Sequence, residues 1–389
     1  MAMELKTGSE IDGFTIGECM HVGGMGFIYR VSGPATGFPM MMKVPRLGRA
    51  EPTEGVVGFE AEAMVLPTLR GAHVPRFVAA GDLSRTPYLV TEWIEGCTFE
   101  PLVQRAPLPP DEVARVGAAL ADAVECLHQQ DVIHLDIKPG NAILRPDGRV
   151  VLIDFGLSHH TRLPDLLAEE MRRAIGTAQY ISPEQVLGVR SDPRSDIFSL
   201  GVVLYELATG ELPFGSPRSI TAMRDRLWLD PRPPRASIKD FPPWLQEVIL
   251  RCLAVRPEQR YPTAAQLAFD LRNPQGVQIT ARAEKTRRVG FISHVRRWLW
   301  ASGREAQTAV APAQQSASAP IVLAAVDTAH LDDDLQQALQ GAVLRVIGHA
   351  PEARLSCVAV LTGTPVQDGD RPQDTASGMH LDHLVRLRH

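Results

Sequence analysis

The sequence lacks the features that mark several large classes of protein. Its start, MAMELKTGSE, shows no basic stretch followed by an apolar one, so we expect no secretory signal peptide. No apolar run approaches the roughly 18–20 residues that a helix needs to span a bilayer. The formal net charge of −5 gives no general reason to expect a nucleic-acid partner. We therefore expect a cytoplasmic protein that has no transmembrane segment and binds no nucleic acid.

Cysteine is scarce, and its spacing argues against the common cysteine-based frameworks. The chain has five cysteines, an odd number, and no two of them form a CxxC pair. They are scattered at Cys19, Cys97, Cys126, Cys252 and Cys357. This pattern fits neither a disulfide framework nor a structural zinc site. We expect reduced and mostly buried thiols, which agrees with a cytoplasmic location.

Two parts of the chain differ in their apolar patterns. Residues 11–100 carry short apolar runs separated by glycine and proline, which predict strands, and one helical stretch at 56–70. From residue 111 the apolar spacing becomes that of helices, in the stretches 111–130, 195–210, 243–255 and 263–272. The second of these is apolar on nearly every side, so we expect it to be buried. A strand-rich lobe of about residues 10–95 thus precedes a helical lobe of about residues 96–272.

The composition changes beyond residue 272. Residues 282–304 contain seven Lys and Arg, and apolar residues at helical spacing lie among them, namely Phe291, Val295, Trp298 and Leu299. We interpret this stretch as an amphipathic helix packed on the helical lobe. Peripheral contact with an anionic membrane surface is the alternative. A linker rich in Ala, Gln, Ser and Pro follows, so that residues 273–319 form a connecting segment.

The stretch VIHLDIKPGNAIL sets several polar residues in an apolar frame. An acid, a lysine and an amide follow one another at Asp136, Lys138 and Asn141. Further along comes LIDFGLS with Asp154, and upstream lie a glycine-rich stretch, HVGGMGFIYRV, and an isolated lysine, Lys43, in an apolar strand. Each of these signals is weak alone. Their order and spacing together are specific.

Phosphoryl transfer requires groups of these kinds. Its transition state needs charge neutralisation and positioning more than covalent chemistry. Backbone N–H groups of a glycine-rich hairpin can cover phosphates because no side chain obstructs them. Mg²⁺ prefers carboxylate and amide oxygens, and an acceptor hydroxyl needs a carboxylate that takes its proton. The sequence therefore indicates an enzyme that transfers a phosphoryl group.

The set resembles the protein kinase signature over about residues 10–272. The GGMG loop, the HxDxKPxN form and GTAQYISPEQ are similar to those of bacterial, eukaryotic-like Ser/Thr kinases. The resemblance implies an α+β, bilobal protein kinase fold that uses ATP and Mg²⁺ and phosphorylates protein substrates. It also implies the roles of four residues: Asp136 as catalytic base, Lys138 against the transferred phosphate, and Asn141 and Asp154 as Mg²⁺ ligands.

The same resemblance assigns further residues to the nucleotide. Lys43 would hold the α and β phosphates and pair with Glu62. Glu60 competes for that pairing, but two residues are about 200° apart around a helix, so only one can face Lys43. Glu62 is chosen because its spacing to the following leucines fits the family. The other assignments are Gly23, Gly24 and Gly26 over the phosphates, Ile28 and Met41 beside adenine, Thr91 as gatekeeper, and Glu92 to Ile94 as the hinge.

Other residues would support the site. By the resemblance, Glu184 of the SPE motif pairs with Arg260 in a structural ion pair, and Asp196 braces the catalytic loop. Thr177 is assigned to the catalytic loop by hydrogen bonding rather than as a phosphorylation site. Ser182 replaces the alanine that the family has in this motif, which is a mild change.

Three departures from the family pattern bear on regulation and on the nucleotide pocket. Leu135 stands where most such kinases carry the arginine that binds a phosphorylated activation segment. We therefore expect that loop phosphorylation is not the main switch, although Thr161 and Thr177 lie in the segment. His21 occupies the first glycine position of the loop, and Met41 replaces a small alanine. None of these changes removes a catalytic group.

The end of the chain has a pattern of its own. Residues 320–361 predict a strand, a helix and a strand, a short α/β (βαβ) unit. This unit resembles the beginning of a universal stress protein domain, in which Asp327 would lie where that family often contacts nucleotide. The resemblance stops before the glycine-rich phosphate loop of the ATP-binding members. We expect residues 320–389 to be an abbreviated or truncated domain that docks or self-associates through its open sheet edge.

Three functions remain open from the sequence. The first is an active Ser/Thr protein kinase in bacterial signalling or stress response. The second is a catalytically weak, ATP-binding pseudokinase scaffold, which the departures at His21, Met41 and Leu135 motivate. The third is a small-molecule kinase of the same fold. The 31 residues from Asp154 to Glu184, with GT and SPE, favour a protein substrate.

Overall fold

The chain divides into two compact units, Met1–Ala313 and Gln314–His389. The computed structural model describes residues 5–23, 26–34, 36–46, 53–82, 86–168, 177–217, 220–287, 312, 321–327, 333–349 and 354–360. No helix in these ranges is both long enough and apolar enough to cross a membrane.

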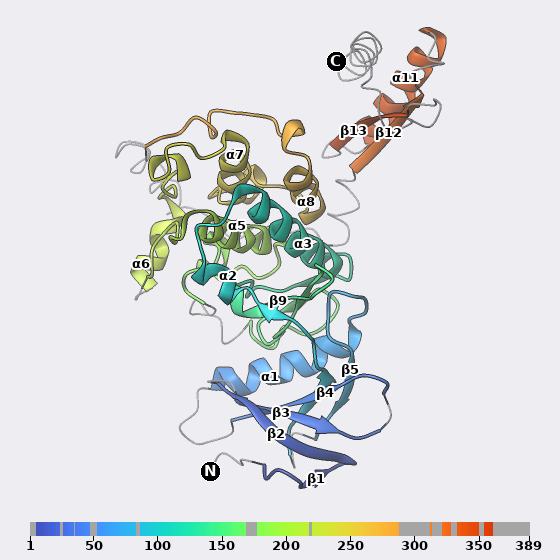
Figure 1. Ribbon diagram of the computed structural model, residues 1–389, viewed down its shortest axis with the longest axis vertical. Helices are drawn as coiled ribbons and strands as arrows, with labels where there is room; N and C mark the ends of the chain where they lie inside the picture. Colours follow the sequence, from blue (N-terminus) through green and yellow to red (C-terminus); the bar gives the residue numbers. More distant parts are fainter. Residues whose placement is uncertain are drawn as a thin grey trace, which may run out of the picture. The chain divides into compact units, whose positions relative to one another are not determined.

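The first part of the larger unit is a strand-rich lobe. Its six strands are antiparallel and lie in the spatial order β1-β2-β3-β4-β6-β5. Their bounds are β1 (Glu10–Ile11), β2 (Phe14–Val22), β3 (Gly26–Ser32), β4 (Met40–Pro45), β5 (Phe77–Ala80) and β6 (Leu89–Glu92). One helix, α1 (Thr53–Val65), lies between this sheet and the helical lobe (Figure 1). The predicted strand-rich lobe is therefore present.

The helix predicted at 56–70 is present but ends earlier. α1 ends at Val65, and the single turn η1 (Leu66–Thr68) continues in the tighter 3₁₀ form. Pro67 lacks an N–H for the helical hydrogen-bond pattern and disfavours the helical conformation of the residue before it. The proline inside the predicted stretch thus explains the earlier end.

The helical lobe is organised around two long helices that pack together. The buried stripe of α3 (Pro110–His128) faces α5 (Arg194–Thr209), which is buried from Ser195 to Tyr205, as predicted (Figure 1). A Cβ on Gly117 would lie 2.4 Å from a methyl carbon of Leu204, so a larger residue there would force that leucine side chain to move. The other helices are α2 (Glu100–Gln104), α4 (Pro183–Val186), α6 (Ile220–Arg224), α7 (Pro243–Cys252) and α8 (Ala264–Arg272).

Short strands frame the stretch that carries the predicted catalytic residues. β8 (Val132–Ile133) precedes it and pairs with β11 (His159–His160). β9 (Ala142–Leu144) follows it and lies between β7 (Cys97–Thr98) and β10 (Val150–Leu152). The apolar residues on both sides of Asp136 are therefore anchored in two small sheets, and the polar residues lie on the loop between them. Single 3₁₀ turns complete the lobe: η2 (Pro139–Asn141), η4 (Asp225–Leu227), η5 (Pro234–Ala236), η6 (Pro257–Gln259) and η7 (Pro274–Gly276).

The predicted basic helix at 282–304 falls mostly outside the described residues. The described part, residues 282–287, forms turns rather than a helix and lies in the larger unit. The apolar residues that suggested the helix, at positions 291, 295, 298 and 299, are outside the described ranges.

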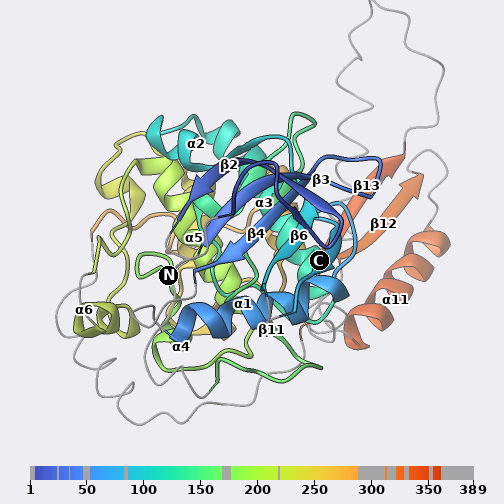
Figure 2. The ribbon, with the colours of Figure 1, turned by 90° about the horizontal axis from the view of Figure 1, so that it is seen from below.

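The smaller unit contains a strand, a helix and a strand. β12 (Ile321–Asp327) pairs in parallel with β13 (Arg354–Val360), and α11 (Asp333–His349) connects them. Figure 2 shows α11 beside the two paired strands. Asp327 is the last residue of β12, opposite Val360.

Candidate active site

A cavity of about 290 Å³ lies between the two lobes of the larger unit. Eight residues that the sequence assigned to the nucleotide or its Mg²⁺ line it: Ile28, Met41, Lys43, Thr91, Glu92, Trp93, Ile94 and Asp154. The sheet brings the first of these together, because Ile28 on β3 pairs with Lys43 on β4, and Met41 pairs with Thr91 on β6. A mostly apolar wall with a few convergent polar groups is typical of a small-molecule site.

Sequence reasoning missed part of this wall. Met20, Ile143 and Ile153 also line the cavity, and so does His21, which had been considered only as a glycine replacement. Ile143 could have been found, because it lies on the short strand β9, which begins directly after Asn141. Met20 offered no such signal.

Lys43 lies in a cluster of opposite charges. Its Nζ is 2.6 Å from Oε2 of Glu62 and 3.1 Å from Oδ1 of Asp154. Burial lowers the pKa of Lys43, but the negative charges of Asp154 and Glu62 outweigh it, and the net shift is upward. Burial raises the pKa of Asp154, but the charge of Lys43 outweighs it, and the net shift is downward. The lysine is therefore a fixed cation, and its partner is Glu62 rather than Glu60.

Asp136 is the centre of a second network. Its Oδ2 accepts hydrogen bonds from Lys138 Nζ at 2.7 Å and from Asn141 Nδ2 at 2.9 Å. Its Oδ1 accepts from the hydroxyl of Thr177 at 3.1 Å, and Lys138 also donates to that hydroxyl at 2.9 Å. The structure thus brings together four residues that the sequence placed in one site, although Thr177 is 41 positions from Asp136.

A buried carboxylate holds the backbone of the loop that carries Asp136. Asp196, fully buried at the start of α5, accepts from the backbone N–H groups of His134 and Leu135, both at 2.8 Å, and from His128 at 2.9 Å. Leu135 has φ +63°, which is costly for a branched residue, and Gln185 donates to its carbonyl at 2.9 Å. The predicted bracing by Asp196 is confirmed.

The strands β2 and β3 line one side of the cavity through Met20, His21 and Ile28, whereas Gly23 and Gly26, at the turn between them, are not among its lining residues. The N–H of Gly23 donates to the carbonyl of Gly26 at 2.9 Å, and Gly24 lies outside the described residues. Gly26 has φ +150°, and a Cβ there would lie 2.1 Å from the carbonyl oxygen of Val44. Only glycine therefore lets β3 approach β4 next to Lys43.

We expect Gly26→Ala to raise the KM for ATP about tenfold and to lower stability by about 1–3 kcal/mol, since the clash separates β3 from β4. ATP titrations of the transfer rate and urea unfolding measure both effects. Gly37→Ala is the matched control, because Gly37 also has a positive φ, +76°, but open space around it. If the two variants lost equal amounts of stability and of affinity for ATP, the steric explanation would be contradicted.

The SPE motif is fixed by the predicted ion pair. Arg260 donates to both carboxylate oxygens of Glu184, at 2.5 and 2.8 Å, and both residues are buried. Ser182 begins α4 as its N-cap, since its hydroxyl accepts from the N–H of Gln185 at 3.2 Å. Serine in place of alanine thus adds a helix cap.

The donor set near Asp136 suits a magnesium ion. The amide nitrogen of Asn141 donates hydrogen bonds to Asp136, so its amide oxygen is the atom that could bind a metal ion. Asp154 supplies a carboxylate whose pKa is lowered. Two hard oxygen ligands are enough for Mg²⁺, which keeps several waters and binds substrate phosphates. Among the described residues, no cluster of three or more His, Cys, Asp or Glu could form a metal cage of protein ligands alone.

Comparisons with known proteins agree with this geometry. A family model described as "Protein kinase domain" matches residues 14–270. The chain is 32% identical over 289 residues to serine/threonine-protein kinase PknB of Mycolicibacterium smegmatis, a match that covers 71% of this chain and 46% of PknB. It is 34% identical over 252 residues to serine/threonine-protein kinase PknL of Mycobacterium bovis, covering 64% of this chain and 62% of PknL.

A solved structure shows the same fold. The kinase domain of Mycobacterium tuberculosis PknI aligns with a TM-score of 0.54 and 24% identity, over 70% of this chain and all of that domain. The chain spans less than half the length of the PknB that it matches. The family match covers well over half of the sequence, in the two lobes that enclose the cavity. The chain therefore belongs to the protein kinase family.

Proposed function

We propose that this chain is a Ser/Thr protein kinase that transfers the γ-phosphate of ATP to hydroxyls of protein substrates. The observation that carries the proposal is the network around Asp136, in which Lys138 and Thr177 fix both oxygens of a nearly buried carboxylate. The curated relatives, bacterial kinases by name, support the same activity.

The charges of the site suggest a role in phosphoryl transfer for each of its residues. Lys43, held as a cation by Glu62 and Asp154, would bind the α and β phosphates and orient ATP. Asp136 would accept the proton of the substrate hydroxyl, and Lys138 would lie against the phosphate in transfer. Asn141 and Asp154 would hold Mg²⁺, which neutralises negative charge on the phosphates when bound.

The pseudokinase alternative finds little support in the three departures. Met41 and His21 line the cavity, and neither forms a hydrogen bond with Lys43, Asp136 or Asp154 among the contacts of the described residues. Leu135 is 2% exposed, and its backbone takes part in the bracing of the loop. The charged groups are therefore arranged for transfer, and a protein substrate is favoured by the fixed SPE motif.

We propose further that the kinase is active without phosphate on its activation segment. Arg190 donates to Asp165 Oδ2 at 2.8 Å and also to the carbonyls of Leu157 and Ser158, at 3.1 and 3.3 Å. Burial raises the pKa of Asp165, but the His159 ring, whose Nδ1 is 3.3 Å from Asp165 Oδ2, and the charge of Arg190 outweigh it and lower the pKa to about 2. A permanent carboxylate thus ties the segment to the residues after Asp154, as a phosphate does elsewhere.

The sequence of the segment agrees with this proposal. Residues 162–176 contain no Ser, Thr or Tyr. The hydroxyl residues between Asp154 and Glu184 are Ser158, Thr161, Thr177, Tyr180 and Ser182. Four of them, Ser158, Thr177, Tyr180 and Ser182, use their hydroxyl oxygen in a hydrogen bond within the lobe.

We expect Thr161→Ala to change kcat by less than about twofold, because Asp165 and not a phosphate holds the segment. Substitutions away from key contacts usually have effects of this small size. Arg190→Gln, which leaves Asp165 without its cation, is expected to lower kcat about tenfold or more. Initial rates of the two variants test this. A large loss in Thr161→Ala together with a normal rate in Arg190→Gln would show that a phosphate is needed.

The activity itself is tested by ³²P transfer from ATP to a generic basic protein, with Mg²⁺ and with excess EDTA. Incorporation that needs Mg²⁺ and maps to serine or threonine supports the proposal. If nothing is transferred while ATP still raises the melting temperature, the scaffold function takes its place.

We propose the domain division predicted from the sequence, with one adjustment. The folded kinase unit extends past residue 272, since residues 280–285 pack on α7. The strand–helix–strand unit at 321–360 is proposed as a partial, universal-stress-protein-like appendage that serves docking or self-association through its two-stranded sheet.

A further inference from the structure

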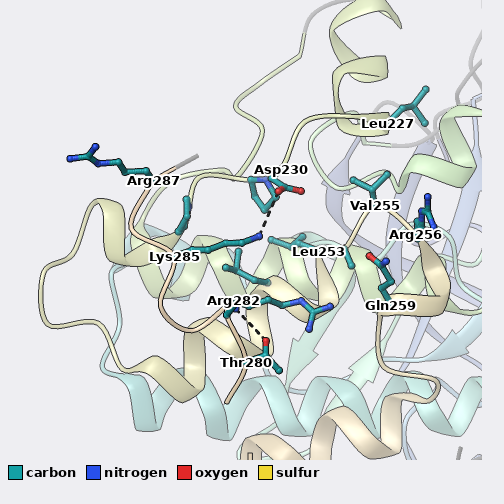
Figure 3. Close-up of a pocket in the computed structure, with 15 residues that line it drawn as sticks. Leu227, Asp230, Leu253, Val255, Arg256, Gln259, Thr280, Arg282, Lys285 and Arg287 are labelled. Carbon is teal, nitrogen blue, oxygen red and sulfur yellow. Dashed lines mark hydrogen bonds and ion pairs between the residues drawn. The ribbon is translucent and has the colours of Figure 1, made fainter. Parts of the chain in front are cut away.

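A second and larger cavity, of about 540 Å³, lies in the helical lobe. It opens where the segment Thr280–Arg287 runs past the end of α7 and the turn η6 (Figure 3). We call it the α7 cavity. None of its lining residues also lines the cavity at Lys43, so phosphoryl transfer gives it no role.

Two buried polar side chains of α7 fix the wall of this cavity. Gln246 is fully buried and donates to the carbonyls of Arg282, Ala283 and Lys285, at 2.8, 3.0 and 2.9 Å. Glu247, 2% exposed, accepts from the N–H groups of Thr280 and Ala283, at 3.0 and 3.1 Å. Buried polar groups with all these partners hold a backbone in one place. The wall is therefore formed before any ligand binds.

The lining of the α7 cavity combines an apolar floor with excess positive charge. Leu227, Leu250 and Leu253 are at most 7% exposed and form the floor. The charged side chains that line the cavity are Arg256, Arg282, Lys285 and Arg287, against the single acid Asp230. Figure 3 shows Lys285 reaching toward Asp230, and Arg282 extending toward Gln259.

Two of these cations, Lys285 and Arg282, have long ion pairs. Lys285 Nζ lies 3.7 Å from Asp230, and Arg282 lies 3.3 Å from Glu247, which is behind the wall. A full charge-assisted hydrogen bond is about 2.7–2.9 Å long. The two cations thus keep donor capacity for an anion inside the cavity.

We propose that the α7 cavity binds a small organic phosphate that has an apolar body. Arginine and lysine together favour phosphate, which accepts several charge-assisted hydrogen bonds, and the leucine floor favours an apolar group next to it. A cavity of this size matches the range of about 300–1,000 Å³ typical of small-ligand sites. The phosphate can belong to a free metabolite or to a lipid headgroup.

The test uses 1-naphthyl phosphate as the probe, with the full chain and saturating ADP and Mg²⁺ so that the cavity at Lys43 is filled. Calorimetry is expected to give a Kd below about 1 mM, and naphthol or inorganic phosphate alone is expected to bind at least about tenfold more weakly. The double variant Arg256→Gln, Lys285→Gln is expected to bind the probe about tenfold more weakly or worse. The matched control, Arg105→Gln with Arg115→Gln, removes two charges that are 59% and 61% exposed and is expected to bind normally.

Arg287→Gln gives an independent measurement, because Arg287 is exposed and its loss leaves the wall intact; we expect about threefold weaker binding. Vesicles that contain phosphatidylglycerol distinguish the source of the phosphate. Binding of the probe in solution with loss in the variants supports the proposal. Binding to the vesicles alone, if the same variants lose it, supports the proposal and assigns the phosphate to a lipid headgroup. Equal affinity in all variants, or binding to neither the probe nor the vesicles, overturns the proposal, and neither result depends on kinase activity.

Discussion

Asp136→Asn is expected to lower kcat by about three orders of magnitude, within the range of about 10²–10⁴ for the loss of a positioned general base. Asparagine keeps the shape of the side chain and can still meet Thr177, but it cannot take a proton. Because Asp136 is 6% exposed and lies outside the lining of the nucleotide cavity, ATP binding should change little. Initial transfer rates and ATP titrations measure the two quantities separately.

Asp147→Asn is the control for this variant. Asp147 pairs with Arg149 at the surface, away from the catalytic loop, and its side chain is 41% exposed. We expect a normal rate. If Asp136→Asn kept more than about a tenth of the wild-type rate, the assignment of Asp136 as the base would be wrong.

Arg260→Ala is expected to lower the free energy of unfolding by about 3–5 kcal/mol. The Arg260 side chain is fully buried, and its loss leaves the Glu184 carboxylate, 9% exposed, without its cation. It also removes hydrogen bonds to the carbonyls of Arg194 and Ala254, at 2.8 Å each. Urea unfolding followed by far-UV circular dichroism measures the change.

Arg272→Ala provides the comparison, since it breaks a pair with Asp122 in which the two side chains are 51% and 37% exposed. Exposed pairs contribute about 0–1 kcal/mol. Similar losses in Arg260→Ala and Arg272→Ala would mean that burial of the pair does not determine its contribution.

The sequence predicted those parts of the site in which chemistry restricts the residue types. Lys43, Asp136, Asn141 and Asp154 could be assigned because their residue types, order and spacing resemble the protein kinase signature. The buried helix α5 was also predictable, since nearly every side of it is apolar. The fold and the members of the site therefore followed from local patterns.

Contacts between distant residues could not be predicted in this way. Arg190 meets Asp165 across 25 positions, and Gln246 meets Ala283 across 37. An arginine or a glutamine can form many kinds of hydrogen bond, and the sequence around it does not reveal which distant carbonyl or carboxylate it will contact. The α7 cavity and the phosphate-free anchoring of the segment depend on such contacts and so became visible only in the folded chain.

The claim that the kinase is active without phosphate on its activation segment is tested most directly by the rate of its first turnovers. The protein is first treated with a phosphatase, and mass spectrometry confirms that it carries no phosphate at the start. We predict transfer at the full rate from the first turnover, with no lag, because the charges around Asp136 and the Asp165–Arg190 pair are already in place. A lag that shortens as the protein concentration rises would show that the kinase must first be phosphorylated. No transfer at all would contradict the kinase function itself.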